Sequence, residues 1–437
     1  MASTIDTIFL RAPDFQRFKK PPRVMVIGAG SRGTAYAEAA LQGTNAIIAG
    51  VCEPVYSKRE TFLKRFIKRP DLNRPYPQLP AQPGEMFFDW QQWVEWIDEY
   101  RDGDIKNQKF DAIDVAFGWW HFSHSYVRGN WRKESTSAPS LLTKSCHDID
   151  FLMWMFCTPD TSASPPHLPS TITSTGSLKY FRKSRKPVEA GSATNCLSCA
   201  YEPSCSYSAK KIYLEKQLAE GNADWPVKIV NPEIEDIYRS NGLEAASSQL
   251  LTNLTEDYDS TTPLEVRNKK NYFGRCVWES DNDVCDDQIV TLTWDDDGDN
   301  PNRGAKTALF HMIAHTEKQC ERRGRMYGTK GEIEYDSITI SVHDFATGET
   351  SKHVPHAAGG GHGGGDAGLV RQFLMAVDAV EQEQMSTHEA QRAYLGCDLE
   401  EAFLSHAVVF AAEDARTQKK VVDWATWWED NVESQLQ

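Results

Sequence analysis

Three glycines near the start of the chain have the spacing of a turn that binds phosphate groups. The sequence GAGSRG at residues 28–33 follows an apolar run of strand type and precedes an alanine-rich stretch that suits a helix. Gly28 allows a tight turn, Gly30 lets backbone N–H groups approach a pyrophosphate, and Gly33 lets the helix pack closely on the strand. The N-terminus of that helix adds oriented N–H groups and a partial positive charge.

An acidic residue follows at the distance where such a turn needs one. A second apolar run ends at Glu53, twenty residues beyond Gly33, where a carboxylate accepts a hydrogen bond from the ribose 2′-hydroxyl of NAD. A carboxylate repels the 2′-phosphate of NADP, so the sequence favours NAD, although Lys58 and Arg59 keep NADP open. The alternative is an ordinary strand–turn–helix without a ligand. We predict that the cofactor is held by Gly28, Gly30, Ser31, Arg32, Gly33 and Glu53.

A second group of reactive side chains lies at residues 143–150, TKSCHDID. In a helix, Lys144, His147 and Asp148 would lie close to one face. A lysine and a histidine that face a nicotinamide can act as acid or base for an alcohol proton while hydride leaves the same carbon. We predict His147 and Lys144 as catalytic residues, and the alternative is a surface helix with ordinary charges.

Aromatic and basic side chains are concentrated at residues 121–131, HFSHSYVRGNW. Aromatic faces pack on sugar rings, and arginine and histidine side chains bond to hydroxyl groups. The block therefore suits a polyhydroxylated substrate, and we predict His124, Arg128 and Trp131 as substrate-binding residues. The alternative is a loop with its aromatic side chains in the core and its histidines exposed.

Three cysteines have a spacing that suits a metal site. Cys196-x2-Cys199-x5-Cys205 provides three soft ligands, and Cys276 is our candidate for the fourth ligand of a structural zinc ion. A disulfide pair and free thiols remain open as alternatives. A run at residues 353–366 combines three histidines with six glycines, which predicts a hinge or lid near a site, a surface loop, or a metal-binding tract.

Strands and helices alternate in the first quarter of the chain. Apolar, strand-type runs occur at 24–27, 46–52 and 112–116, with a short candidate at 87–88, and helical stretches occur at 34–42, 57–68 and 90–97. This alternation predicts a parallel, doubly wound α/β sheet. A complete dinucleotide fold has about six strands, and we count only four before residue 117, so we expect a truncated Rossmann-type sheet.

The rest of the chain predicts a different architecture. Strand patterns at 288–294, 307–314 and 332–342, with helical patterns at 209–220, 233–240, 369–380 and 388–419, indicate an α+β domain with a mainly antiparallel, open sheet. We therefore expect a polar N-terminal extension at 1–21, an incomplete dinucleotide-binding (Rossmann) domain at 22–116, and an α+β substrate domain at 117–437.

Composition limits the classes of partner. A formal net charge of −15 at pH 7 argues against nucleic acid and anionic membranes as partners. No run of about 18 apolar residues is present, so we expect no transmembrane helix. The first 22 residues have no long apolar core like that of a secretory signal, and ten cysteines in such a chain suggest reduced thiols or metal ligands. We therefore expect a cytoplasmic protein.

Taken together, these motifs resemble those of the Gfo/Idh/MocA oxidoreductase family, in particular its streptomycin-biosynthesis-type branch. The resemblance rests on the glycine turn with Glu53 and on HSYVRGNW at 124–131, SCHDID at 145–150, the cysteine loop at 199–207, GTKGE at 328–332 and GHGGGD at 361–366. It covers nearly everything after residue 21. It implies a dinucleotide-binding domain, an open-sheet α+β domain through which homo-oligomers form, and NAD(P)-linked redox chemistry on a sugar or cyclitol.

The chain departs from the family pattern at two places. Family members carry a Glu-Lys-Pro motif after the fifth strand, and this tripeptide is absent from the sequence. It should fall between Ala116 and Phe117, where the strand count is short, which indicates a deletion or a misjoined gene model. The family's Asp-x-x-x-His pair aligns with Thr143 and His147, so only the histidine is kept, and Lys144 stands beside the vacant acid position.

Our leading hypothesis is an NAD(P)-dependent oxidoreductase that acts on a sugar or cyclitol hydroxyl or carbonyl. Two alternatives stay open. Relatives of this fold include glycosidases that retain NAD, and the missing block favours a non-catalytic, nucleotide-binding pseudo-enzyme. We expect a small carbohydrate substrate, and neither a nucleic acid nor a membrane as a partner.

Overall fold

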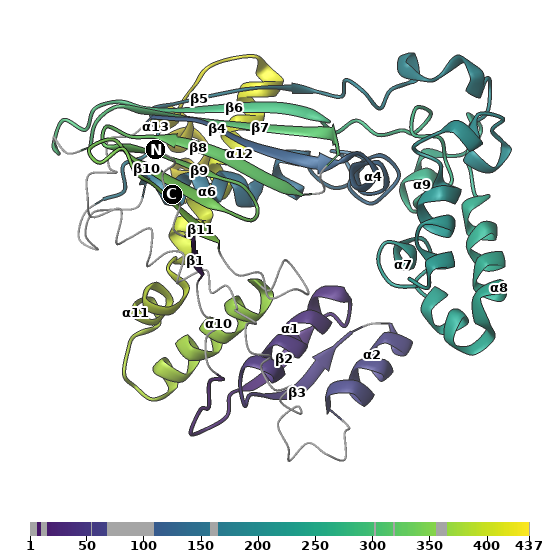
Figure 1. Cartoon of the computed structure of the whole chain (residues 1–437), viewed down its shortest axis with the longest axis horizontal. Coiled ribbons are helices and arrows are strands. Elements are labelled where there is room, and N and C mark those ends of the chain that lie inside the picture. The colour runs from purple at the N-terminus through teal and green to yellow at the C-terminus, as the bar shows by residue number, and fades with distance from the viewer. Residues whose placement is uncertain are drawn as a thin grey trace. The chain divides into compact units, whose positions relative to one another are not determined.

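The computed structural model describes residues 7–9, 15–53, 55–67, 109–157, 165–300, 303–317, 320–354 and 365–436. The chain divides into two compact units, each built from two segments: Met1–Gln108 with Arg325–Leu404, and Lys109–Gly324 with Ser405–Gln437. Two of the boundaries between these segments fall inside elements, in β8 (Glu321–Tyr327) and in α12 (Leu399–Gln418) (Figure 1). The domain boundaries after residues 21 and 116 stay predictions.

In the first unit, β2 (Arg23–Ile27) and β3 (Ile47–Cys52) pair in parallel, and α1 (Ser31–Gly43) connects them. The β-branched residues of the two strands suit a pleated sheet, and the recurring alanines of α1 favour a helix. The strands and the helix that the sequence predicts around the glycine turn are therefore confirmed.

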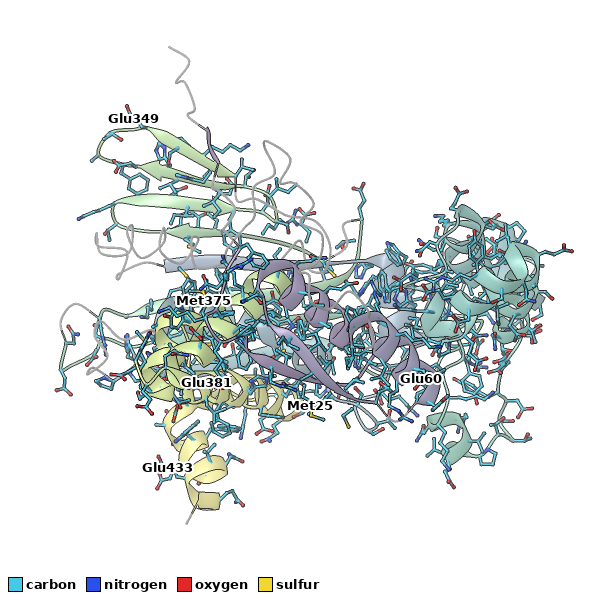
Figure 2. The ribbon with its side chains drawn as sticks, turned by 90° about the horizontal axis from the view of Figure 1, so that it is seen from below. Met25, Glu60, Glu349, Met375, Glu381 and Glu433 are labelled. Carbon is cyan, nitrogen blue, oxygen red and sulfur yellow. The ribbon has the colours of Figure 1, made fainter. Side chains whose placement is uncertain are left out.

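One core cluster joins this parallel pair to a helix from much later in the chain. Its buried members are Phe18, Val26, Ala37, Ala40, Ala46, Ile48, Phe62, Phe66 and Leu374. Leu374 belongs to α10 (Gly365–Glu381), which packs against α1. Helix α10 ends at Glu381 (Figure 2). Oε2 of Glu381 lies 3.6 Å from Nζ of Lys20. The first unit therefore needs both of its chain segments to complete its core.

The first unit also contains strands that pair in the order β1-β11-β10-β9-β8. The central three, β9 (Gly331–Tyr335), β10 (Ile340–Asp344) and β11 (Thr350–Val354), are antiparallel, and β1 (Thr7–Phe9) adds in parallel to β11. The single strand predicted at 332–342 is wrong, because the Asp336 carboxylate accepts the backbone N–H groups of Ile338 and Thr339 and turns the chain there.

Shorter helical elements complete the first unit: α2 (Tyr56–Phe62), a π-helical turn at Leu63–Ile67, α11 (Thr387–Ala390) and a second π-helical turn at Gln391–Leu395. The long helix predicted at 388–419 is interrupted, because Gly396 adopts a left-handed conformation with φ 71°. The strand predicted at 87–88, the helix predicted at 90–97 and the glycines at 359–361 and 363–364 lie outside the described residues.

The second unit is organised around strands in the order β4-β7-β6-β5-β12. They are β4 (Lys109–Gly118), β5 (Thr171–Ser177), β6 (Asp287–Trp294), β7 (Lys306–Thr316) and β12 (Val422–Asp423). All neighbours in this set are antiparallel except β4 and β7. Side chains along β6 alternate between half-buried and buried, which is the pattern of a sheet with one face on a core. The predicted fold class, a parallel α/β part followed by a mainly antiparallel α+β part, is confirmed.

Strand β4 corrects one sequence-based expectation. We expected residues 112–116 to be the last strand of the parallel sheet around the glycine turn, but β4 pairs in parallel with β7. Val115 of β4 lies opposite Met312 of β7, and both side chains are fully or almost fully buried. β4 spans Ala116 and Phe117, and its register with β7 shifts between Ala116 and Gly118, so the point where we expected missing sequence lies at an irregularity inside one strand.

In the described ranges, the α-helices of the second unit are α4 (Trp119–Phe122), α5 (Ser140–Thr143), α6 (Cys146–Cys157), α7 (Val227–Val230), α8 (Ile234–Leu254), α9 (Leu264–Asn268), the part of α12 from Ser405 onward, α13 (Trp424–Trp428) and α14 (Ser434–Leu436). Helix α8 is kinked at Gly242, where φ is 81°. Its buried face packs in a second core cluster with the predicted helical stretch at 209–220, which forms a π-helical turn, Lys210–Glu215, and a 3₁₀ turn, Leu218–Glu220. No helix in the described ranges is both long and apolar enough to cross a membrane.

Candidate functional site

The glycine turn has the backbone geometry that the sequence predicts. Gly28 follows β2 with φ +90°, a conformation that L side chains rarely adopt, and its N–H donates to the carbonyl of Cys52 at 2.7 Å. A Cβ added to Gly33 would lie 1.8 Å from the carbonyl oxygen of Gly28. The chain therefore passes too close to itself at Gly33 for any larger residue.

The opposite side of the turn is open. A Cβ added to Gly28 or Gly30 would meet no atom within 4 Å. Gly30 is the N-cap of α1, and the first N–H groups of an α-helix have no partner within the helix. The turn thus offers space and N–H donors together, which fits the diphosphate of a dinucleotide.

Glu53 borders this turn at the carboxyl end of β3. Its Oε2 accepts the backbone N–H of Ala29 at 2.8 Å, and its Oε1 accepts that of Val55 at 2.9 Å. The bond from Val55, the bond from Ala29 and the cations Lys58 and Arg59 lower the pKa of Glu53. A carboxylate is therefore held in its charged form beside the glycine turn, where the sequence predicts a ribose.

Arg32 of α1 is held by Asp366, a pairing that sequence reasoning did not predict. Its Nη1 lies 2.9 Å from each carboxylate oxygen of Asp366, in the first turn of α10. Asp366 is 334 positions away, so no local pattern could have identified the pair. Arg32 is thus fixed at the start of α1, and its predicted contact with the cofactor stays a prediction.

In the second unit, the structure separates the two predicted catalytic residues into different elements. Helix α5 ends at Thr143, Lys144 has the non-helical angles φ −133° and ψ −50°, and α6 begins at Cys146. The single helix that would place Lys144 and His147 on one face is therefore not formed. The Lys144 ammonium donates to Sγ of Cys320 at 3.3 Å, and His147 is exposed on the first turn of α6.

Charged partners surround this break between the helices. Nε of Arg322 donates to Oδ1 of the buried Asp148 at 2.5 Å. Burial raises the pKa of Asp148 against the opposing effect of Arg322. Loss of hydration lowers the pKa of His147, Arg322 and Lys144 add to this effect, and Asp148 opposes it. His147 is thereby favoured as the neutral imidazole, the form that accepts a proton.

His124 lies in the interior of the second unit. It belongs to a π-helical turn, Ser123–Val127, and is 0% exposed. Its ring centroid is 5.5 Å from that of Trp120 and 5.2 Å from that of Trp225. Among the described residues, neither of its ring nitrogens has a hydrogen-bond partner. Burial lowers the pKa of His124 well below its usual value, and the neighbouring His121 and Arg128 add to this effect.

Arg128 is also buried, at 1% exposure, and it connects three segments of the chain. Its Nε donates to the carbonyl of Arg275 at 2.6 Å, and its Nη2 donates to the carbonyl of Tyr207 at 2.8 Å and to Sγ of Cys196 at 3.4 Å. Trp131, by contrast, is 41% exposed. The structure therefore does not bring these three candidates to one surface, and their contact with a substrate stays a prediction.

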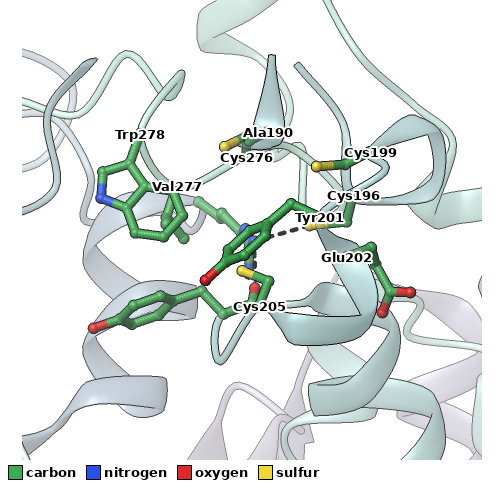
Figure 3. Close-up of a pocket in the computed structure, with 11 residues that line it drawn as sticks. Ala190, Cys196, Cys199, Tyr201, Glu202, Cys205, Cys276, Val277 and Trp278 are labelled. Carbon is green, nitrogen blue, oxygen red and sulfur yellow. Dashed lines mark hydrogen bonds between the residues drawn. The ribbon is translucent and has the colours of Figure 1, made fainter. Parts of the chain in front are cut away.

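The four predicted metal ligands lie around one pocket (Figure 3). Cys196, Cys199, Cys205 and Cys276 all line it, together with Arg128 and six further residues. All four thiols are free, and burial raises the pKa of Cys205 to about 11. Within the described parts of the chain, no three His, Cys, Asp or Glu side chains are placed so that they could hold a metal ion.

Comparisons by sequence identify no relative. No protein-family model matches the chain, and no curated protein matches it.

Comparisons by structure find several proteins that are described as dehydrogenases. The chain is similar to the myo-inositol dehydrogenase of Corynebacterium glutamicum ATCC 13032, with a TM-score of 0.43 at 10% identity over 92% of this chain and 98% of that one. It is similar to myo-inositol 2-dehydrogenase from Lactobacillus plantarum, with a TM-score of 0.42 at 11% identity over 92% of this chain and 99% of that one. It is also similar to the WlbA dehydrogenase of Bordetella pertussis, which was solved in complex with NADH and UDP-GlcNAcA. The TM-score is 0.41 at 10% identity over 92% of this chain and 99% of that one. Similarity at this level does not assign an activity or a substrate.

Proposed function

We propose that the chain binds NAD or NADP at the turn between β2 and α1 and is an oxidoreductase of the Gfo/Idh/MocA type. The observation that carries this proposal is the geometry of the turn. Gly28 has φ +90°, Gly33 has no room for a side chain, and the ionised carboxylate of Glu53 bonds to Ala29 inside the turn. A parallel strand–turn–helix–strand with these features is the structure that dinucleotides require.

Different residues of the turn would bind different parts of the cofactor. The N–H groups at the start of α1 would bind the diphosphate, with Gly28 and Gly30 leaving room for it. Glu53 would accept hydrogen bonds from the ribose hydroxyls and would repel a 2′-phosphate, which favours NAD over NADP. The nicotinamide, when bound, supplies or accepts a hydride.

The protein's own chemical task is the movement of a proton. Oxidation of an alcohol releases the hydroxyl proton as the hydride leaves the same carbon, and reduction reverses both transfers. We assign the transfer of this proton to His147, whose exposed imidazole is favoured in its neutral form. We assign Lys144 as the partner of His147 in this transfer. The substrate class we propose is a sugar or cyclitol, with the exposed Trp131 ring as a surface for it to pack on.

Two measurements on the purified full-length chain test this function. Calorimetric titration with NAD and with NADP should detect binding, with NAD the tighter ligand. Absorbance of the reduced nicotinamide should then change with at least one member of a sugar and cyclitol panel. Absence of binding to either cofactor overturns the proposal. If the chain binds the cofactor and releases a sugar without a net absorbance change, it is an NAD-retaining glycosidase instead. If it binds the cofactor but neither releases a sugar nor changes the absorbance, it is a pseudo-enzyme.

A further inference from the structure

We propose that Cys196, Cys199, Cys205 and Cys276 together bind one thiophilic metal ion, for which Zn²⁺ is the natural probe. All four line a single pocket, although Cys276 is distant in sequence from the other three (Figure 3). A zinc ion in a structural site takes four such ligands, and four cysteines suffice. The inference is independent of the proposed cofactor site, because the pocket lies inside the second unit and the glycine turn lies in the first.

Backbone hydrogen bonds bring the distant cysteine to the others. The N–H of Cys196 donates to the carbonyl of Gly274, and the N–H of Cys276 donates to the carbonyl of Thr194, each at 2.8 Å. These bonds form an antiparallel bridge between Asn195 and Arg275. A Cβ on Gly274 would lie 1.7 Å from the carbonyl oxygen of Leu254, so the bridge is packed tightly against α8. The chain therefore fixes Cys276 beside the cysteine loop.

Short turns hold the other three cysteines. Cys196 begins a 3₁₀ turn, Cys196–Ser198, which the Asn195 side chain caps by accepting the N–H of Leu197 at 2.9 Å. A second 3₁₀ turn, Glu202–Ser204, leads into Cys205, whose N–H donates to the carbonyl of Glu202 at 3.0 Å. The pocket is thus built by hydrogen-bonded turns on one side and by the bridge on the other.

A cation, Arg128, and a carboxylate, Glu202, both line the pocket, and Oε1 of Glu202 already accepts the hydroxyl of Ser208. The guanidinium of Arg128 is 1% exposed, and its described hydrogen-bond acceptors are the carbonyls of Arg275 and Tyr207 and the sulfur of Cys196. Its Nη1 has no hydrogen-bond partner within the described residues. A buried cation is costly unless an opposite charge accompanies it. Four thiolates around a divalent ion carry a net negative charge, and they would provide that counter-charge.

Binding of the ion must draw the sulfurs together, because the described residues hold no ready group of three ligands. Cys196 already accepts hydrogen bonds from Nη2 of Arg128 and from the backbone N–H of Ala209, both at 3.4 Å. Donors of this kind stabilise a thiolate.

The test uses the full chain, purified under reducing conditions without a chelator. Elemental analysis should find one zinc ion per chain. After removal of the metal, Zn²⁺ should protect four thiols from alkylation, as counted by mass spectrometry of peptides, and leave the exposed Cys52 and Cys397 reactive. A chain without zinc whose four thiols react equally with and without added Zn²⁺ overturns the proposal. A disulfide between any two of the four in the reduced-purified chain overturns it as well.

Variants separate ligation from folding. Cys276→Ser should lose the bound zinc, whereas Cys285→Ser should keep it, because Cys285 is equally buried but does not line the pocket. If Cys276→Ser does not fold, Cys199→Ser provides the same comparison at a half-buried position. Retention of one zinc ion per chain in a folded Cys276→Ser or Cys199→Ser variant contradicts the assignment.

Discussion

The backbone N–H of Ala29 donates to Oε2 of Glu53 across 2.8 Å, which ties the glycine turn directly to the end of β3. The carboxylate thereby lies beside the turn at which we propose that the dinucleotide binds. Its other oxygen accepts the N–H of Val55 at 2.9 Å, so both oxygens are oriented by backbone. The acid is fixed before any ligand arrives.

This bond leads to a prediction on cofactor choice. Glu53→Gln should weaken NAD binding by about tenfold or more, as expected for the loss of a hydrogen bond to a charged group. NADP should lose less, because the neutral amide no longer repels a 2′-phosphate. Titration calorimetry with both cofactors measures the ratio, and Glu60→Gln on α2 is the control with the same change of charge. An unchanged ratio of affinities in Glu53→Gln would show that Glu53 does not contact the ribose.

A second prediction concerns Gly33. Gly33→Ala should lower the free energy of unfolding of the first unit by about 1–3 kcal/mol, the usual cost of overpacking, because the new Cβ meets the Gly28 carbonyl. Cofactor binding should fall with it. Gly43→Ala, at the other end of α1, should be neutral or slightly stabilising, since its Cβ would meet nothing within 4 Å. Denaturant midpoints compare the two, and equal midpoints would refute the close approach.

A third prediction concerns the proton. Provided that a substrate is found, His147→Asn should lower kcat by about 10²- to 10⁴-fold, the usual contribution of a general acid–base group. Calorimetric binding of NAD should not change, because His147 is not part of the glycine turn. Lys144→Met should lower kcat by a smaller factor, and His388→Gln, at an exposed site in the first unit, should have no effect. Full turnover in His147→Asn would remove that residue from the mechanism.

A fourth prediction concerns acid stability. Burial lowers the pKa of His121 to about 3 from its ordinary value of 6.5, and it also lowers the pKa of His124. Between about pH 3 and pH 6.5, these two histidines bind protons in the unfolded chain but not in the folded chain. Stability should therefore fall as the pH drops below about 6.5, by at most about 1.4 kcal/mol per pH unit for each histidine.

The variant His124→Phe isolates this effect. It should show a smaller loss of stability between pH 7 and pH 5 than the parent chain, because one buried histidine with a lowered pKa is gone. His388→Gln serves as the exposed control and should retain the parent's pH dependence. Urea unfolding at both pH values gives the comparison, and an unchanged slope in His124→Phe would show that this histidine is not buried in its neutral form.

The parts of the fold that sequence reasoning predicted are those with local signals. The glycine turn, its flanking strands and α1 lie within thirty residues and each is marked by composition. Cys276 was our candidate for a fourth ligand by residue type alone, and it lines the same pocket as the cysteine loop. These elements depend on neighbours in the chain or on an uncommon side chain.

The parts that sequence reasoning missed depend on distant contacts. Asp366 pairs with Arg32, Cys320 accepts from Lys144, and β4 pairs with β7, and no periodicity marks any of these partners. The break at Lys144 was also missed, although Thr, Ser, Cys, His and Asp, which make up most of residues 143–148, are weak helix formers. A residue's type suggests its chemistry, but its partner follows only from the fold.

The first unit takes Val26 and Ala37 from the beginning of the chain and Leu374 from near its end. During synthesis on a ribosome, the glycine turn therefore emerges long before the helix that covers α1. The second unit's long inner segment, Lys109–Gly324, is made in that interval. We therefore expect the nascent β2–α1–β3 segment to remain without a complete core until α10 has been translated, a period in which a chaperone would find its apolar face uncovered.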